Sequence, residues 1–99
     1  MAGLTVTIIT RDEVDRLGEA VASAAFADEI VIVDSGSSDG TIELARRLTP
    51  RVIVREWPGF AAQKNFAASQ ASHDWIFSLD ADERVSPALA AEIGRASCR

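Results

Sequence analysis

The chain has 99 residues, of which 47% are hydrophobic and 25% are charged. This length and apolar content suit one small folded domain or part of one, and they exclude a disordered chain. The formal net charge of −5 argues against general nucleic-acid binding, because that needs lysine and arginine to neutralise phosphates.

Three further observations concern the cellular compartment. No stretch approaches the ~20 consecutive apolar residues that a membrane span needs, and the first residues lack the pattern of a signal peptide. The only cysteine is Cys98, so an internal disulfide and a cysteine metal cluster are both excluded. These features predict a cytoplasmic protein.

Strand-like and helix-like stretches alternate along the chain. Runs rich in β-branched residues predict strands at 4–10, 29–34, 51–55 and 74–79. Helical spacing of apolar residues predicts helices after Asp12, after Gly40, from Phe60 to about Gln70, and from Ser86 to about Ile93. The order βαβαβαβα predicts an α/β fold with a Rossmann-like, open and mainly parallel sheet of four strands. Residues 1–93 would form one unit, and residues 94–99 a tail that is a foreign remnant or a truncation point.

Individual residues and short segments give four local expectations. Asp12 is expected to cap the first helix with its side chain, and Ser86 followed by Pro87 is expected to begin the last one. Leu48 is placed to pack inward from the second helix. The almost wholly apolar strand at 29–34 is expected to be buried on both faces, as strands of parallel sheets are.

Two carboxylates, Asp80 and Asp82, follow the apolar run 75–77 closely and are separated by one residue. In an extended segment residues i and i+2 point the same way, so both side chains are expected to face one target. Carboxylate oxygens suit hard divalent cations, and the pair therefore predicts a site for Mg²⁺ or Mn²⁺. An isolated Asp-x-Asp is common on solvated loops, so the prediction depends on what accompanies it.

Polar residues also follow the first two predicted strands. Residues 10–13 follow the first, and Asp34 begins a glycine-containing turn after the second. Ligands of open α/β sheets bind at the carboxyl ends of the strands, so these residues are expected to share one site with the acidic pair. The turn leads into a helix N-terminus and can cradle an anion. Asp34 either contacts a nucleoside or bonds the backbone of its own turn, while Asp39 is expected to cap the helix.

Other chemistries lack their residues. The P-loop and the dinucleotide-binding glycine pattern are absent, as are a Gly-x-Ser-x-Gly nucleophile motif and a zinc cluster of histidine and cysteine. The carboxylates of residues 80–83 lie on one loop, and such neighbours seldom flank a scissile bond from opposite sides. A glycosidase is therefore disfavoured.

Four segments match a known family in their order and spacing, at residues 9–13, 33–41, 59–67 and 79–83. Together they resemble the family 2 glycosyltransferases, and most of all the branch related to lipopolysaccharide-core β-glucosyltransferases. The resemblance covers about residues 4–93. One departure is Asp12-Glu13, where the family usually has Asn-Glu.

The resemblance implies a truncated GT-A fold that binds a nucleotide-diphospho sugar, expected to be UDP-linked. The nucleotide-binding residues that it implies are Thr10, Arg11, Glu13, Asp34, Gly36, Lys64 and Asp80. The implied metal ligands are Asp80 and Asp82, with Asp82 the stronger candidate for direct contact. Lys64 would approach the base or the diphosphate, and the cofactor would be Mg²⁺ or Mn²⁺.

The implied activity is metal-dependent transfer of the sugar to an acceptor hydroxyl with inversion, in the synthesis of cell-envelope polysaccharide or lipopolysaccharide. The acceptor would be a saccharide or a lipid-linked molecule, and the enzyme would lie in the cytoplasm or at the inner face of the plasma membrane. The family's general base comes from the later half of the domain. It is therefore expected beyond residue 99, with Glu83 a poor substitute, and the chain alone would only bind donor.

Truncation would leave the edge of the fourth strand uncovered, which predicts a homodimer through that edge or a domain swap of the last helix. The alternative function is a non-catalytic nucleotide-binding or interaction module with the same half-fold. A phosphoacceptor receiver domain is disfavoured because Asp12-Glu13 lies too far into the helix start and no fifth strand is predicted. A nucleotidyltransferase is disfavoured because residues 10–13 are not a loop rich in glycine and basic residues.

Overall fold

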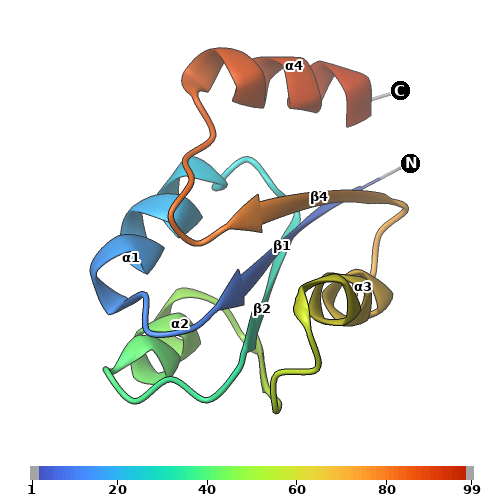
Figure 1. Ribbon diagram of the computed structural model, residues 1–99. Coiled ribbons are helices and arrows are strands. Elements are labelled where there is room, and N and C mark those ends of the chain that lie inside the picture. The colour runs from blue at the N-terminus through green and yellow to red at the C-terminus, as the bar shows by residue number, and fades with distance from the viewer. Residues whose placement is uncertain (1–2, 98–99) are drawn as a thin grey trace.

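The computed structural model describes residues 3–97 as an alternation of strands and helices around one sheet (Figure 1). The elements are β1 Leu4–Thr10, α1 Val14–Ser23, β2 Glu29–Asp34, α2 Thr41–Leu48, β3 Arg51–Val54, α3 Phe60–Ser69, β4 Trp75–Asp80 and α4 Pro87–Ser97. All strand pairs are parallel, and the order across the sheet is β3-β2-β1-β4. The predicted α/β fold and its four-stranded parallel sheet are confirmed.

The strand order places a topological switch beside β1. From β1 the chain adds β2 and β3 on one side, and α3 then carries it back so that β4 pairs with the opposite side of β1. The register aligns Thr10 with Asp34 and Ile9 with Asp80. The carboxyl ends of β1, β2 and β4 therefore meet at one edge, where open α/β sheets bind ligands.

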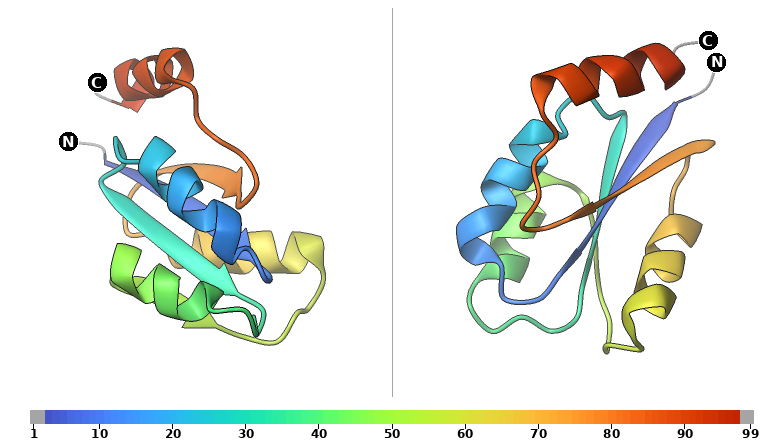
Figure 2. Two further views of the ribbon diagram at one scale, coloured as in Figure 1. Left: turned by 90° about the vertical axis from the view of Figure 1, so that its left-hand side faces the viewer. Right: turned by 45° about the horizontal axis from the view of Figure 1, so that its top comes forward.

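Helices cover both faces of the sheet, as the right-hand view of Figure 2 shows. On one face α1 and α2 enclose the larger core cluster, which includes Ile8, Leu17 and Ile32, and α4 adds Ala90 and Ile93 at its border. On the other face α3 covers a smaller cluster. Its fully buried members are Val31, Val33 and Ala67. Because β2 contributes to both clusters, its prediction as a strand buried on both faces is confirmed along 31–34.

The capping of α1 differs from the sequence prediction. Asp12 has a φ of 52° and lies outside the helix, with its carboxylate accepting a hydrogen bond from the backbone N–H of Ser38. The N–H of Val14 instead donates to Asp39 at 3.2 Å, and Asp39 lies in the loop after β2. The prediction for Asp12 was wrong because aspartate tolerates the left-handed conformation and turns its side chain toward a neighbouring loop.

The remaining expectations are mixed. Ser86 begins α4 as predicted, and its hydroxyl oxygen accepts a hydrogen bond from the N–H of Leu89 at 3.1 Å. Leu48 is exposed at the end of α2, so its inward placement was wrong. The last helix reaches Ser97, beyond the predicted end near Ile93, because a single glycine at position 94 weakens a helix without necessarily ending it. Residues 1–2 and 98–99, which include part of the predicted tail, lie outside the described residues.

Within residues 3–97, none of the helices has the length and apolar character needed to cross a bilayer.

Candidate functional site

A hollow of about 220 Å³ lies at the carboxyl ends of β1 and β4. Its lining comes from the end of β1, the loop before α3, the start of α3 and the turn after β4, and comprises Ile9, Thr10, Arg11, Glu13, Trp57, Phe60, Asp80, Ala81 and Asp82. Five of the residues predicted from the sequence are thus brought together, from two segments 70 residues apart. Asp34, Gly36 and Lys64 do not line this hollow, although Lys64 and Asp34 contact the lining residues Asp80 and Thr10.

The acidic pair reaches the hollow by a different geometry from the one predicted. Asp80 is the last residue of β4, and the chain then turns, with the N–H of Glu83 donating to the carbonyl oxygen of Asp80 at 2.9 Å. The Glu83 side chain closes the same turn by accepting the N–H of Asp80 at 2.9 Å. Ala81 is buried and Asp82 is exposed. The prediction that Asp80 and Asp82 face one way along an extended segment was wrong, and a tight turn joins them instead.

Asp80 is held by a basic residue from α3. The Nζ atom of Lys64 lies 3.5 Å from Oδ1 of Asp80 and 4.7 Å from the centre of the Phe60 ring. That Oδ1 atom is itself buried, and among the described residues no donor makes a hydrogen bond to it. A buried carboxylate oxygen without a donor is under-satisfied, so it retains the capacity to bind a further cation or donor.

Asp34 organises the turn between β2 and α2. The residue is fully buried, and its Oδ2 atom accepts the backbone N–H groups of Gly36 and Ser37, both at 2.7 Å. Its Oδ1 atom accepts the hydroxyls of Thr10 at 2.6 Å and Ser37 at 2.5 Å. The turn-forming role is therefore present, and Thr10 ties the end of β1 to it. The contact of Asp34 with a nucleoside stays a prediction.

Gly36 permits this turn, because its φ of 99° lies in the left-handed region that glycine occupies without steric cost. A Cβ atom at this position would meet nothing within 4 Å. The backbone conformation, rather than lack of space, accounts for the glycine.

The loop after β1 is fastened to the loop after β2 by several polar contacts. The N–H of Glu13 donates to the hydroxyl of Thr41 at 2.9 Å, and Asp39 accepts hydrogen bonds from Val14 and Thr41. The hydroxyl of Thr41 bonds Asp39 closely and lowers the pKa of that carboxyl, so Asp39 stays ionised while it caps the helix ends. These contacts position Glu13 at the wall of the hollow.

Three carboxylates line the hollow, and two of them, Asp80 and Asp82, are the predicted ligands of a divalent cation. Among residues 3–97 there is no cluster of three or more histidine, cysteine or acidic side chains arranged to hold a metal. Asp80 and Asp82 provide carboxylate oxygens, which are hard ligands. Mg²⁺ is commonly bound by one or two carboxylates together with substrate phosphates. The residues present therefore fit a cation that is shared with a diphosphate.

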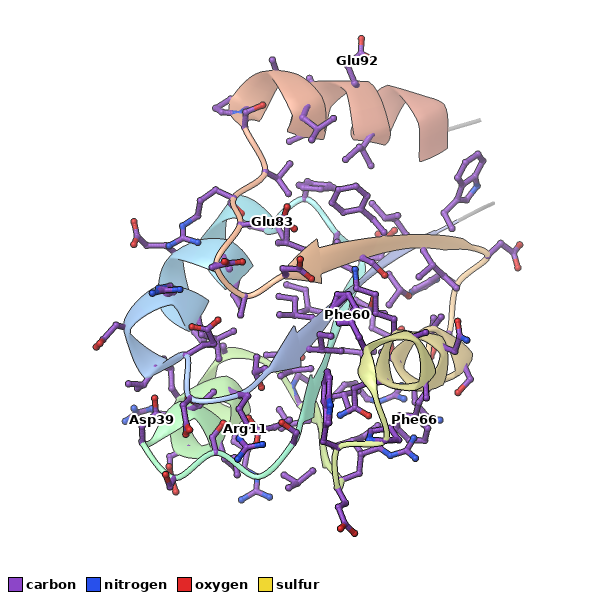
Figure 3. The ribbon with its side chains drawn as sticks, in the orientation of Figure 1. Arg11, Asp39, Phe60, Phe66, Glu83 and Glu92 are labelled. Atoms are coloured by element: carbon purple, nitrogen blue, oxygen red, sulfur yellow. The ribbon has the colours of Figure 1, made fainter. Side chains whose placement is uncertain are left out.

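Two aromatic residues in the lining were missed by the sequence analysis. The side chains of Trp57 and Phe60 flank Pro58-Gly59, and their rings lie 6.4 Å apart at an angle of 41°. The available signal was a pair of large aromatic residues around a turn dipeptide, where loops are usually polar. Phe60 lies at the start of α3, and Arg11 follows β1 (Figure 3).

The family profile described as Glycosyl transferase family 2 matches residues 5–94. The chain belongs to this family. Curated relatives of this glycosyl transferase family 2 chain include an "uncharacterized glycosyltransferase" of Rickettsia felis, which is 42% identical over 94 residues, 94% of this chain and 33% of the relative. The lipopolysaccharide core biosynthesis glycosyltransferase LpsC of Rhizobium meliloti is 43% identical over 91 residues, 87% of this chain and 34% of that protein. The chain thus spans about a third of the length of these relatives.

Solved structures place the family 2 chain among GT-A glycosyltransferases. The mannosyltransferase PcManGT of Pyrobaculum calidifontis, in complex with GDP-Man and Mn²⁺, superposes with a TM-score of 0.80 at 26% identity, covering 97% of this chain and 32% of that one. S. aureus TarS 1-349 in complex with UDP-GlcNAc gives a TM-score of 0.73 at 21% identity, covering 94% of this chain and 30% of that one. The predicted GT-A type of fold is confirmed.

Proposed function

We propose that this chain binds the nucleotide-diphospho sugar donor of a family 2 glycosyltransferase, together with a divalent cation. The observation that carries the proposal is the hollow at the switch point, which is lined by Thr10, Arg11 and Glu13 from the end of β1 and the loop after it, and by Asp80 and Asp82 from the end of β4 and the turn after it. Similar proteins support the ligand class, because TarS has been solved with UDP-GlcNAc and PcManGT with GDP-Man and Mn²⁺. UDP is the nucleotide that we expect here.

Asp82 and Asp80 are the residues that would hold the cation, since both line the hollow, with Asp82 exposed and Asp80 half-buried. A cation bound there supplies positive charge against the negative charge that develops on the departing diphosphate. Lys64 stands 3.5 Å from Asp80 and can add a second positive charge to the same phosphates. Mg²⁺ and Mn²⁺ both suit a pair of carboxylates.

The residues around the hollow would orient the donor. Thr10 and Asp34 are joined by a buried hydrogen bond, so the ends of β1 and β2 form a rigid floor for the nucleoside. Gly36 lacks a side chain and so leaves the backbone of the turn beside this floor accessible. Glu13 offers a hydrogen-bond acceptor and Arg11 offers donors, and both residues line the hollow. A preorganised site of this kind loses little conformational entropy when the donor binds.

The reaction that we propose is direct attack of an acceptor hydroxyl on the anomeric carbon, with inversion and loss of the nucleoside diphosphate. The attack needs a general base. Glu83 is a poor candidate, because its carboxylate already accepts the backbone N–H of Asp80 within the turn. We place the base and the acceptor site in a region beyond residue 99, since the relatives are about three times as long.

LpsC acts in lipopolysaccharide core biosynthesis according to its name, and we extend that setting to this chain as a proposal. The acceptor would be a saccharide or lipid-linked molecule of the cell envelope. The protein would work in the cytoplasm or at the inner face of the plasma membrane.

Calorimetric titration of the chain with UDP tests the proposal. Binding is expected with Mn²⁺, and it should disappear with EDTA and in the Asp80→Asn/Asp82→Asn double variant. Asp74→Asn removes an exposed carboxylate that directly precedes β4, at the end of the strand opposite the hollow, and should bind UDP as the unaltered chain does. Failure of both the chain and the full-length protein to bind UDP or GDP with Mn²⁺ would refute the proposal and favour a non-catalytic interaction module.

The edge of β4 supports a further proposal on assembly. β4 is a terminal strand of the sheet, and Trp75 and Ile76 on it are 43% and 44% exposed. An open strand edge with exposed apolar side chains favours pairing with another copy. We expect a homodimer through this edge, or a domain swap of α4, when light scattering is measured on the chain; a monomer at high concentration would contradict it.

A further inference from the structure

Trp57 and Phe60 are unusually exposed for large aromatic side chains beside a polar site. Their exposed fractions are 45% and 53%, and neither belongs to the two core clusters. Folding therefore gains little from burying them. Exposed aromatic faces in a ligand hollow are typically surfaces on which planar or apolar parts of a ligand rest.

Trp57 borders two neighbouring hollows. One is the acidic hollow with Asp80 and Asp82, and the other, of about 180 Å³, is lined by Arg11, Ser35 and Trp57. Among the residues that the structure describes, Arg11 is the other one that lines both. The second hollow lies toward β2, because Ser35 directly follows that strand.

The two hollows lie over adjacent strand ends, the first at β4 and β1 and the second toward β2. β4, β1 and β2 are adjacent strands, so their carboxyl ends extend over two strand spacings, ~10 Å in all. A diphosphate held near Asp80 and Asp82 would then place the ribose over the end of β1 and the base over the end of β2. Trp57 stands beside that last position.

Aromatic and charged contacts connect these two ends along α3. The ring of Trp57 meets that of Phe60, the ring of Phe60 lies under Nζ of Lys64, and that Nζ meets Asp80. Phe60 thus supports both the aromatic residue at the β2 end and the cation at the β4 end. A ligand that extends from Trp57 toward Asp80 would contact an aromatic ring at one end and charged groups at the other.

We propose that the nucleobase of the donor stacks on the indole ring of Trp57, with the guanidinium group of Arg11 against its other face. This assignment rests on the proposed function and adds the residues that receive the base. Indole and guanidinium are both planar groups that stack on bases. Removal of one aromatic stacking partner is expected to weaken nucleotide binding about 5- to 100-fold.

Fluorescence gives a direct readout, because the chain has two tryptophans. Trp75→Phe leaves Trp57 as the single tryptophan without altering the proposed site. Addition of UDP with Mn²⁺ should quench the emission of Trp57, whereas pyrophosphate with Mn²⁺, which has no base, should leave it nearly unchanged. Absence of quenching at UDP concentrations that calorimetry shows to be saturating would overturn the assignment.

Substitution separates this inference from the proposed function. Trp57→Ala should weaken UDP about 5- to 100-fold and leave pyrophosphate binding unchanged, while Trp57→Phe should keep most of the affinity. If Trp57→Ala binds UDP normally and Asp80→Asn/Asp82→Asn does not, the stacking assignment fails and the donor site stands. Equal weakening of UDP and pyrophosphate would also overturn it, since Trp57 would then serve the loop rather than the base. Failure of the unaltered protein to bind UDP or GDP would refute both.

Discussion

Replacement of Asp34 tests whether its carboxylate builds the turn after β2. The carboxylate accepts four hydrogen bonds, two from backbone N–H groups and two from hydroxyls. Asp34→Asn preserves its shape, while Asp34→Ala removes all four acceptor contacts. Comparison of the two variants separates the loss of charge from the loss of the hydrogen bonds themselves.

The expected sizes follow from the identity of the donors. In Asp34→Asn the amide oxygen can still accept the N–H groups of Gly36 and Ser37, and the amide nitrogen can donate to the hydroxyl oxygens of Thr10 and Ser37, which rotate. Only charge assistance is lost, a cost of ~1 kcal/mol. In Asp34→Ala the buried hydroxyl of Thr10 loses its acceptor, although water can reach the exposed Gly36. We expect a cost of ~3 kcal/mol.

Urea unfolding followed by circular dichroism measures both values, and thermal melting provides a check, because ~1 kcal/mol shifts the melting temperature of a domain this size by ~4–8 °C. Asp74→Asn, at an exposed position, serves as the matched control and should change stability by less than ~0.5 kcal/mol. Equal destabilisation by Asp34→Asn and Asp34→Ala would refute the hydrogen-bond assignment. A folded Asp34→Asn variant that no longer binds UDP would add a direct role in the nucleotide site.

Three further substitutions each address one contact, with urea unfolding as the measurement. Burial raises the pKa of Glu29, but hydrogen bonds from Ser72 and the Arg51 ion pair help to hold it below its ordinary 4.5. Glu29→Gln should therefore destabilise the chain at pH 7, and the difference should shrink as the pH falls below 4.5; a constant difference contradicts this. Gln63→Met should stabilise by ~1 kcal/mol, because both amide atoms are buried and unpaired among the described residues; destabilisation would reveal a missed partner. Gly36→Ala should cost ~1 kcal/mol through its positive φ; no cost would show that the turn relaxes.

The elements of this fold were predictable because their signals are local. β1 and β2 begin and end at the predicted residues, since β-branched runs bounded by polar turn residues mark a strand clearly. The edge at which the site forms was also predictable, because parallel strands that alternate with helices bring their carboxyl ends together. The meeting of Thr10, Arg11 and Glu13 with Asp80 and Asp82 also depends on the pairing of β4 with β1, and the sequence analysis did not predict that strand order.

The details that failed depend on contacts between loops distant in sequence. The first N–H of α1 is bonded by Asp39 from the loop after β2, and not by Asp12. No local pattern at residues 11–14 predicts a contact with that distant loop. The turn at Asp80 forms because the side chain of Glu83 folds back onto the strand end, which an alternation rule for extended chains does not consider. The exposed ring of Trp57 was overlooked because sequence periodicity indicates burial for helices and strands but not for loops, and Phe60 is the first residue of α3, where one position does not yet define a helical pattern.

The charges around the acidic hollow explain why a diphosphate would need a cation there. Glu13 and Asp80 have basic partners at 3.5 Å, Arg16 and Lys64 respectively. Among the lining residues that the structure describes, Asp82 and Arg11 are then the two charged side chains that have no ion-pair partner. These two charges cancel, and a chain with a net charge of −5 repels anions at long range. A divalent cation at Asp82 would reverse the local sign, so UDP binding that is equally tight with Mn²⁺ and with EDTA would show that the charge balance argued here is wrong.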